Sequence, residues 1–262
     1  MRVQLLATCL VDHLFPSVGL AAAAVLERCG VEVTVPAGQT CCGQPALNAG
    51  FTDEARRMAR HTIDVLTADD APVMVPSGSC ADMIVHHAPG LLAGDPSYAS
   101  RARAVAARTH ELAQFLVDVA KRPDCGACLA GSATYHPSCH GLRALGVDRQ
   151  PRELLAHVRE LEVRPLRDAE TCCGFGGLFA VKMSDVSGAM LERKLACIEE
   201  SGAGMVVATD MSCLMHIAGG LRRRGSRVAV RHLAEVLAET GARPGTSRRK
   251  APPTTAGAAE PE

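Results

Sequence analysis

The residues of this chain best suited to chemistry are its cysteines, twelve in 262 residues. Eight of them form two sets of the same pattern, with spacings C-x31-CC-x37-C and C-x32-CC-x39-C. The sets are Cys9, Cys41, Cys42 and Cys80, and Cys139, Cys172, Cys173 and Cys213. Four thiolates are the usual ligand number of an iron–sulfur cluster, and sulfur ligands also suit zinc. We therefore expect these eight residues to bind one or two clusters of the [4Fe–4S] type.

Composition agrees with metal or redox chemistry in a reducing compartment. The first thirteen residues lack a secretory signal, and no apolar run is long enough to span a bilayer, so we expect a cytoplasmic protein without a membrane span. Disulfide frameworks are rare there, and cysteine clusters more often bind metal or exchange electrons. The 28 Lys and Arg residues balance the 28 Asp and Glu residues, which argues against a nucleic-acid partner.

The two cysteine sets belong to an internal repeat. ATCLVDH is matched by HPSCHGL, QTCCGQP by ETCCGFG, and VPSGSCADM by ATDMSCLMH, at offsets of 130, 131 and 133 residues between cysteines. Landmarks at nearly constant offset indicate duplication. We predict a first cysteine-rich unit over residues 1–95 and a second over 132–240. A helical connector over 96–131 joins them, and residues 241–262, rich in Pro, Gly, Thr and charge, form a disordered tail.

Short apolar runs alternate with helical patterns. We expect strands at Val3–Thr8, Val31–Val35, Pro72–Pro76, Thr134–His136, Leu161–Val163, Met205–Thr209 and Arg227–Val230. We expect helices at Ser17–Cys29, Thr52–Leu66, Ser100–Ala120, Pro151–Arg159, Ser184–Glu200 and Leu233–Ala238. This alternation predicts an α/β fold with mostly parallel sheets.

The predicted elements place the thiols where a site can form. The single cysteines each follow an apolar strand, so they should lie at the carboxyl edge of a parallel sheet, where helix N-termini favour thiolate. Adjacent cysteines normally point apart, and both can face one site only on an irregular loop. Gly43 and Gly174 give the Cys-Cys-Gly loops that freedom.

The remaining four cysteines do not belong to the repeat. Cys29 and Cys197 sit inside helical patterns and should be core thiols. Cys125 and Cys128 form a C-x2-C pair in the connector, which fits zinc, redox chemistry or chance.

Three histidines lie close to these cysteines in the sequence. His136 and His140 flank Cys139, and His216 follows Cys213 by three residues. A histidine can replace cysteine on an iron, donate a hydrogen bond to a cluster sulfur, or cap a loop. The sequence leaves these roles open.

Six segments together resemble the cysteine-rich CCG domain family, which includes a cysteine-rich component of heterodisulfide reductase and the iron–sulfur subunit of glycolate oxidase. The segments are TCLVD, QTCCGQPALNAG, PSGSCADM, SCHGLRALGV, CCGFGGLFAVKMS and SCLMHIAGG. The resemblance covers residues 3 to 240 and implies two α/β units related by an approximate two-fold axis, with clusters at the cysteines. The full family motif ends in C-x2-C, but Met83 and His216 stand at the last cysteine positions of the two units. The five-cysteine form of the cluster is therefore not expected here.

The resemblance also implies a function. It points to oxidation of L-lactate, or a related 2-hydroxy acid, to the 2-oxo acid during lactate utilization, together with a ferredoxin-like iron–sulfur subunit and a third subunit. No G-x-G-x-x-G sequence follows a predicted strand, so a bound nicotinamide or flavin is not indicated. We expect an electron-transfer subunit that is not catalytic alone. The alternatives are a structural zinc protein and a thiol–disulfide reductase subunit of the heterodisulfide type.

Overall fold

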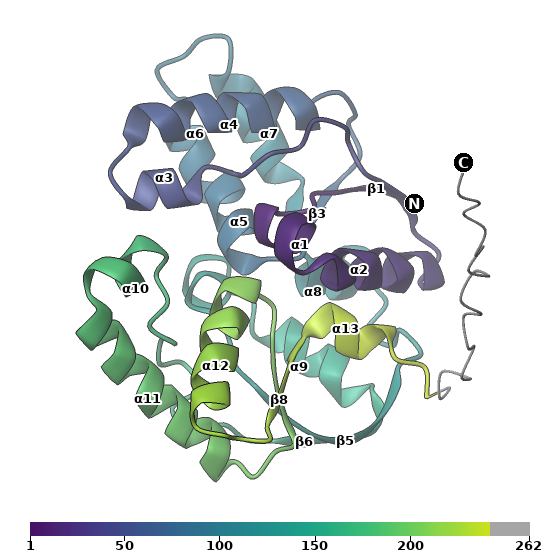
Figure 1. Ribbon diagram of the computed structural model, residues 1–262. Coiled ribbons are helices and arrows are strands. Elements are labelled where there is room, and N and C mark those ends of the chain that lie inside the picture. The colour runs from purple at the N-terminus through teal and green to yellow at the C-terminus, as the bar shows by residue number, and fades with distance from the viewer. Residues whose placement is uncertain (242–262) are drawn as a thin grey trace, which may run out of the picture.

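The computed structural model describes residues 1–241 and has the predicted α/β fold with parallel sheets (Figure 1). In that range there are two sheets of four strands each. The first sheet has the order β2-β1-β3-β4 and the second the matching order β6-β5-β7-β8. The strands are β1 (Arg2–Leu5), β2 (Glu32–Thr34), β3 (Val73–Val75), β4 (Thr109–Glu111), β5 (Cys128–Tyr135), β6 (Arg159–Arg164), β7 (Met205–Ala208) and β8 (Ala229–His232). The repeat seen in the cysteine spacing is therefore a repeat of whole sheets.

Helices connect the strands of each unit, and three short π-helical segments carry the label η. Those of the first half are α1 (Cys9–Leu14), α2 (Pro16–Arg28), α3 (Gln44–Asn48), α4 (Thr52–Leu66), α5 (Gly78–Asp82), η1 (Met83–His87), α6 (Ala88–Leu91), α7 (Ala99–Ala107), α8 (Leu112–Gln114) and η2 (Phe115–Val119). Those of the second half are η3 (His140–Ala144), α9 (Arg149–Ala156), α10 (Leu178–Lys182), α11 (Ser184–Glu200), α12 (Met211–Arg223) and α13 (Leu233–Ala238).

The prediction of one helix over Ser100–Ala120 is wrong. Helix α7 ends at Ala107, and Thr109–Glu111 forms β4, which pairs in parallel with β3. The Glu111 carboxyl group then caps α8, because its Oε2 accepts hydrogen bonds from the backbone N–H groups of Ala113 and Gln114. The stretch 96–131 thus supplies the fourth strand of the first sheet, and the boundary of the first unit remains a prediction.

Helix α12 was not predicted, although its buried residues recur with helical spacing. Leu214, Ile217 and Leu221 all face the interior. The predicted disordered tail lies outside the described residues, apart from Gly241.

The apolar core joins the two units. Its largest cluster includes Leu26 of α2, Leu116 of η2, Leu154 of α9 and Leu233 of α13, so these helices pack between the two sheets (Figure 1). Two smaller clusters lie further out, one beneath α4 and α7 and one beneath α11 and α12. No helix within residues 1–241 is long and apolar enough to cross a bilayer.

Candidate metal centre

The single cysteines lie at the carboxyl edges of the central strands. In the order β2-β1-β3-β4, the chain adds β2 on one side of β1 and then β3 on the other side. Parallel sheets bind ligands at such a switch point, outside the carboxyl ends of the two strands. Cys9 opens α1 directly after β1, and Cys80 lies in α5 after β3. The second unit repeats this with Cys139 just before η3 and Cys213 in α12. The predicted positions of these four thiols at the sheet edges are confirmed.

The two Cys-Cys-Gly loops need glycine for two reasons. Gly43 and Gly174 have φ values of 93° and 89°, in the region that side chains with a Cβ rarely adopt. Each also packs closely on the following long helix. A Cβ on Gly174 would lie 2.6 Å from the carbonyl oxygen of Ser187, and one on Gly43 would lie 3.2 Å from the Cβ of Met58. These contacts fix the direction of the paired cysteines.

The four thiols of each set contact one another. In the first unit, hydrogen bonds from Cys42 and Cys9 lower the pKa of Cys41 to about 2, and Cys42 also contacts Cys80. The same contacts with Cys41 raise the pKa values of Cys9 and Cys42. One sulfur of the set is therefore held as a thiolate, the form that binds metal.

The second unit repeats this arrangement. Hydrogen bonds from Cys139 and Cys173 lower the pKa of Cys172 to about 2, and Cys173 also contacts Cys213. The backbone N–H of Gly174 donates to Cys172 Sγ at 3.3 Å. The loop glycine thus contributes a donor to the thiolate as well as the turn.

All eight cysteines line the same cavity of about 700 Å³ between the units. Sequence reasoning predicted two sets but did not predict that they would face each other. Phe51 and Val181, both more than half exposed, contribute to its lining from opposite units. A group bound by either set would therefore share one enclosure with a group bound by the other.

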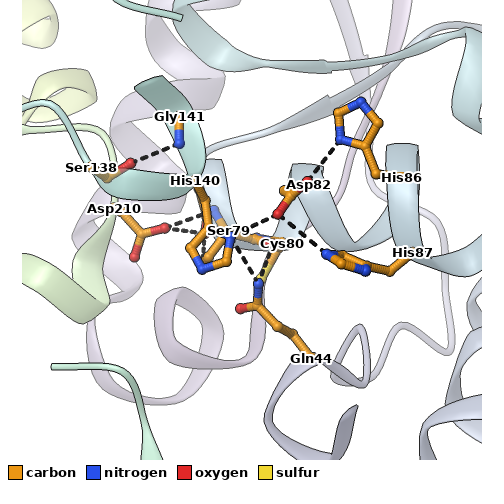
Figure 2. Close-up of polar contacts among 11 residues, drawn as sticks. Gln44, Ser79, Cys80, Asp82, His86, His87, Ser138, His140, Gly141 and Asp210 are labelled. Atoms are coloured by element: carbon orange, nitrogen blue, oxygen red, sulfur yellow. Dashed lines mark hydrogen bonds and ion pairs between the residues drawn. The ribbon is translucent and has the colours of Figure 1, made fainter. Parts of the chain in front are cut away.

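Two equivalent helix caps meet at the edge of this cavity. Ser77 caps α5 and Asp210 caps α12, and they occupy matching positions before Cys80 and Cys213. Ser77 Oγ donates to Asp210 Oδ2 at 3.0 Å, and the backbone N–H of Ser79 donates to the same oxygen at 2.8 Å (Figure 2). Burial opposes the charge of Asp210, but these and other donors lower its pKa. A charged carboxylate therefore joins the two units.

Three imidazoles contact a second buried carboxylate, that of Asp82. His140 Nδ1 lies 2.7 Å from Asp82 Oδ2, His86 Nδ1 lies 2.8 Å from Oδ1, and His87 Nε2 lies 3.5 Å from Oδ2 (Figure 2). Burial opposes ionisation of Asp82, yet the hydrogen bonds from His140 and His86 bring its pKa below the usual value. His140 thus reaches from the second unit to the first. This contact with a carboxylate is not one of the roles that the sequence left open for His140.

His136 lies behind the second set of thiols. It follows β5, is fully buried, and neither ring nitrogen has a hydrogen-bond partner among the described residues. A ring nitrogen of His136 and the sulfurs of Cys173 and Cys213 all lie within 4.8 Å of one another. Burial and the charge of Lys194 lower the pKa of His136 to about 3, so the ring is neutral. An unpaired ring at this place fits a group bound by the neighbouring sulfurs.

His216 and Met83 occupy the positions of the last motif cysteines. The His216 ring stacks edge-on against Phe175, with ring centroids 5.8 Å apart, and its Nε2 lies 3.4 Å from Ser187 Oγ. Met83 is fully buried in η1. Neither residue adds a thiol to its set.

A family model described as the CCG cysteine-rich domain matches residues 3–85 and again residues 133–218. The chain belongs to the CCG cysteine-rich domain family. The two matches fall on the two units, and the resemblance seen in the sequence is confirmed.

Curated relatives match almost the whole CCG chain. Lactate utilization protein A of Geobacillus sp. (strain WCH70) is 47% identical over 237 residues, which cover 90% of this chain and 99% of the relative. Lactate utilization protein A of Exiguobacterium sp. (strain ATCC BAA-1283 / AT1b) is 48% identical over 239 residues, or 91% and 97% of the two chains. The protein of the same name from Bacillus cereus (strain G9842) is 47% identical over 238 residues, or 90% and 98%.

The donor set of this CCG protein fits metal or iron–sulfur binding. Each unit offers four sulfurs linked by successive contacts, one of them with a lowered pKa, and the second adds a buried imidazole without a partner among the described residues. Soft sulfur donors in fours suit iron–sulfur clusters and zinc.

The remaining cysteines lie outside the cavity. Cys197 is buried, as expected of a core thiol. Cys29, at the C-terminal end of α2, is only half-buried, and its contact with Cys125 lowers its pKa to about 7. The Cys125 thiol therefore contacts that of Cys29, which is distant in sequence, and the C-x2-C spacing of Cys125 with Cys128 did not indicate this contact.

Proposed function

We propose that this chain is the iron–sulfur electron-transfer subunit of a complex that oxidises L-lactate, or a related 2-hydroxy acid, to the 2-oxo acid in lactate utilization. The observation that carries the proposal is the convergence of two four-thiol sets on one cavity. The names of these relatives supply the connection to lactate. The same fold could hold other functions, so the substrate rests on this similarity.

We further propose one [4Fe–4S] cluster in each unit. Four thiols per unit match the ligand number, and neither Met83 nor His216 supplies the fifth cysteine of the full motif. The ligands are Cys9, Cys41, Cys42 and Cys80 in the first unit and Cys139, Cys172, Cys173 and Cys213 in the second. When bound, such clusters accept and donate single electrons.

The chain's own residues prepare these sites. Gly43 and Gly174 turn the paired cysteines toward the cavity. Ser77 and Asp210 fix the starts of the helices that carry Cys80 and Cys213, and link the two units to each other. The thiols are thus held before any metal arrives, which lowers the cost of ordering them on binding.

Partner subunits follow from what the sequence lacks. Removal of two electrons and two protons from a 2-hydroxy acid requires a hydride acceptor or a base at the substrate carbon, and no nucleotide-binding glycine motif follows a strand here. We propose a ferredoxin-like iron–sulfur subunit and a third subunit as partners. Exposed apolar side chains in the lining of the cavity, Phe51, Leu178 and Val181, offer a surface for a lasting contact.

Reconstitution tests the proposal. We expect the cluster-loaded chain alone to leave L-lactate unoxidised with an artificial electron acceptor, and to support its oxidation once both partner subunits are added. Turnover by the single chain would place the catalytic site here instead. A complex that oxidises lactate equally well without this chain would reject the electron-transfer role.

A further inference from the structure

The two thiol sets are alike, but the residues behind them differ in charge. At the repeat offset of 130 residues, Leu6 of the first unit and His136 of the second occupy equivalent positions. Helices α4 and α11 align through Met58 and Met190, which make equivalent contacts with the loop glycines. In that alignment Thr62 of α4 is equivalent to Lys194 of α11. An apolar and a hydroxyl side chain thus correspond to an imidazole and a cation.

Lys194 is a buried cation close to the second thiol set. It is fully buried, and its Nζ donates to the backbone carbonyl oxygens of Asp168 and Ala169 at 2.8 and 3.1 Å. Burial lowers its pKa, whereas the negative charges of Cys197, Cys173, Asp168 and Cys139, in decreasing order, raise it. A buried lysine is rare unless it has partners, and here the partners are these two carbonyl oxygens of the segment just before Cys172 and Cys173.

The first unit also has a buried negative charge, Asp82, that the second unit lacks at the matching position. Asp82 lies two residues after Cys80, is buried and is held in its charged form. The matching position after Cys213 is the uncharged Met215. His86, His87 and His140 contact this carboxylate and weaken its electrostatic effect on the first thiol set, but its negative charge stays beside that set.

We propose that the second unit holds its cluster at a higher reduction potential than the first, because Lys194 and His136 stabilise negative charge there. The inference rests on the proposed function. Reduction adds an electron to an already anionic thiolate-bound group, so a nearby cation and hydrogen bonds to sulfur favour the reduced form. Leu6 and Thr62 place no positive charge behind the first set, and Asp82 opposes added negative charge there. Asp210 caps the helix of Cys213 but also accepts hydrogen bonds from Ser77 and Ser79 beside Cys80, so its charge lies between the two sets and acts on both.

His136 acts in this scheme as a positioning residue. A neutral imidazole has one N–H group, and a ring nitrogen lies within 4.8 Å of the sulfurs of Cys173 and Cys213. With a cluster bound, this N–H would be placed to donate to one of these sulfurs, which would give a partner to a ring nitrogen that has none among the described residues.

A redox titration of the full, anaerobically loaded chain, followed by electron paramagnetic resonance, tests the proposal. We expect two midpoint potentials, the higher one lost in Cys173→Ser and the lower one lost in Cys42→Ser. His136→Leu introduces the residue of the first unit, and Lys194→Met removes the charge while keeping the side-chain length. Each should shift the higher midpoint downward and leave the lower midpoint in place.

Arg193→Met is the matched control. It removes the same charge from the neighbouring position of α11, where the side chain is exposed and paired with Asp168, so both midpoints should stay unchanged. Equal midpoints or a higher midpoint in the first unit would overturn the inference alone. A single loaded unit would overturn the inference together with the proposal of one cluster in each unit. Loss of second-unit iron from His136→Leu would also overturn it, because His136 would then be a ligand. A wild-type chain without iron and sulfide would instead reject the proposed function.

Discussion

The two units share the geometry that holds thiols and differ in what surrounds it. Both have the same strand order, a Cys-Cys-Gly turn with a positive φ, and a side-chain cap before the last cysteine. In each unit the last residue of the fourth strand is the buried N-cap of the next helix, and this residue is Glu111 in the first unit and His232 in the second. Ligand placement requires a particular backbone, whereas the charge behind the ligands depends on single side chains. A duplicated site can therefore keep its ligands while its electrostatics diverge.

The largest effect should come from removing one paired cysteine. We expect Cys42→Ser and Cys173→Ser each to lose about half of the bound iron, roughly four atoms, because each belongs to a separate cluster. Cys197→Ser removes a buried thiol outside the cavity and should keep all the iron. Iron and sulfide analysis measures this. Equal losses from all three variants would indicate unfolding and leave the ligand assignment without support.

The next largest effect concerns the buried cap of the first unit. Burial raises the pKa of Glu111 from 4.5 to about 8. The folded state therefore holds this proton more tightly than the unfolded state, so its contribution to stability is full below pH 4.5 and is lost as the pH rises to about 8. The loss is on the order of 3–5 kcal/mol by linkage.

Glu111→Gln should remove most of this dependence. Denaturation of the variant between pH 5 and 8, at fixed iron content, should show a flatter profile than the wild type. The same slope in both proteins would mean that Glu111 is not the titrating group.

The loop glycines should differ between the units. Gly174→Ala should destabilise the protein by about 2–3 kcal/mol, since a positive φ is combined with backbone contact at 2.6 Å. Gly43→Ala should cost about 1 kcal/mol, because its nearest contact is 3.2 Å. Denaturant titration gives both values. A larger cost at Gly43 would reverse the predicted order.

The two helix caps should give effects in the same range as the loop glycines. Asp210 accepts hydrogen bonds from Ser77, Ser79 and Ser212, so Asp210→Ala should cost about 2 kcal/mol by leaving buried donors unpaired. Ser77→Ala removes fewer contacts and should cost about 1 kcal/mol. Similar losses from both, measured by thermal unfolding, would show that the bridge between units adds nothing beyond ordinary capping.

The sequence predicted the α/β class, the repeat and the strand-edge cysteines because those features are local and periodic. It did not predict β4, because a three-residue strand at Thr109–Glu111 depends on pairing with β3 inside an alanine-rich helical pattern. The shared cavity depends on packing between distant segments. Lys194 was missed because a lysine in an amphipathic helix is normally exposed, and only the fold shows that this one is buried.

Iron, acid-labile sulfide and zinc per chain, measured after anaerobic purification, test the central claim most directly. Two four-thiol sets predict about eight iron and about eight sulfide per chain, with no stoichiometric zinc. Zinc bound without sulfide would contradict the account and make the two cysteine sets structural sites instead.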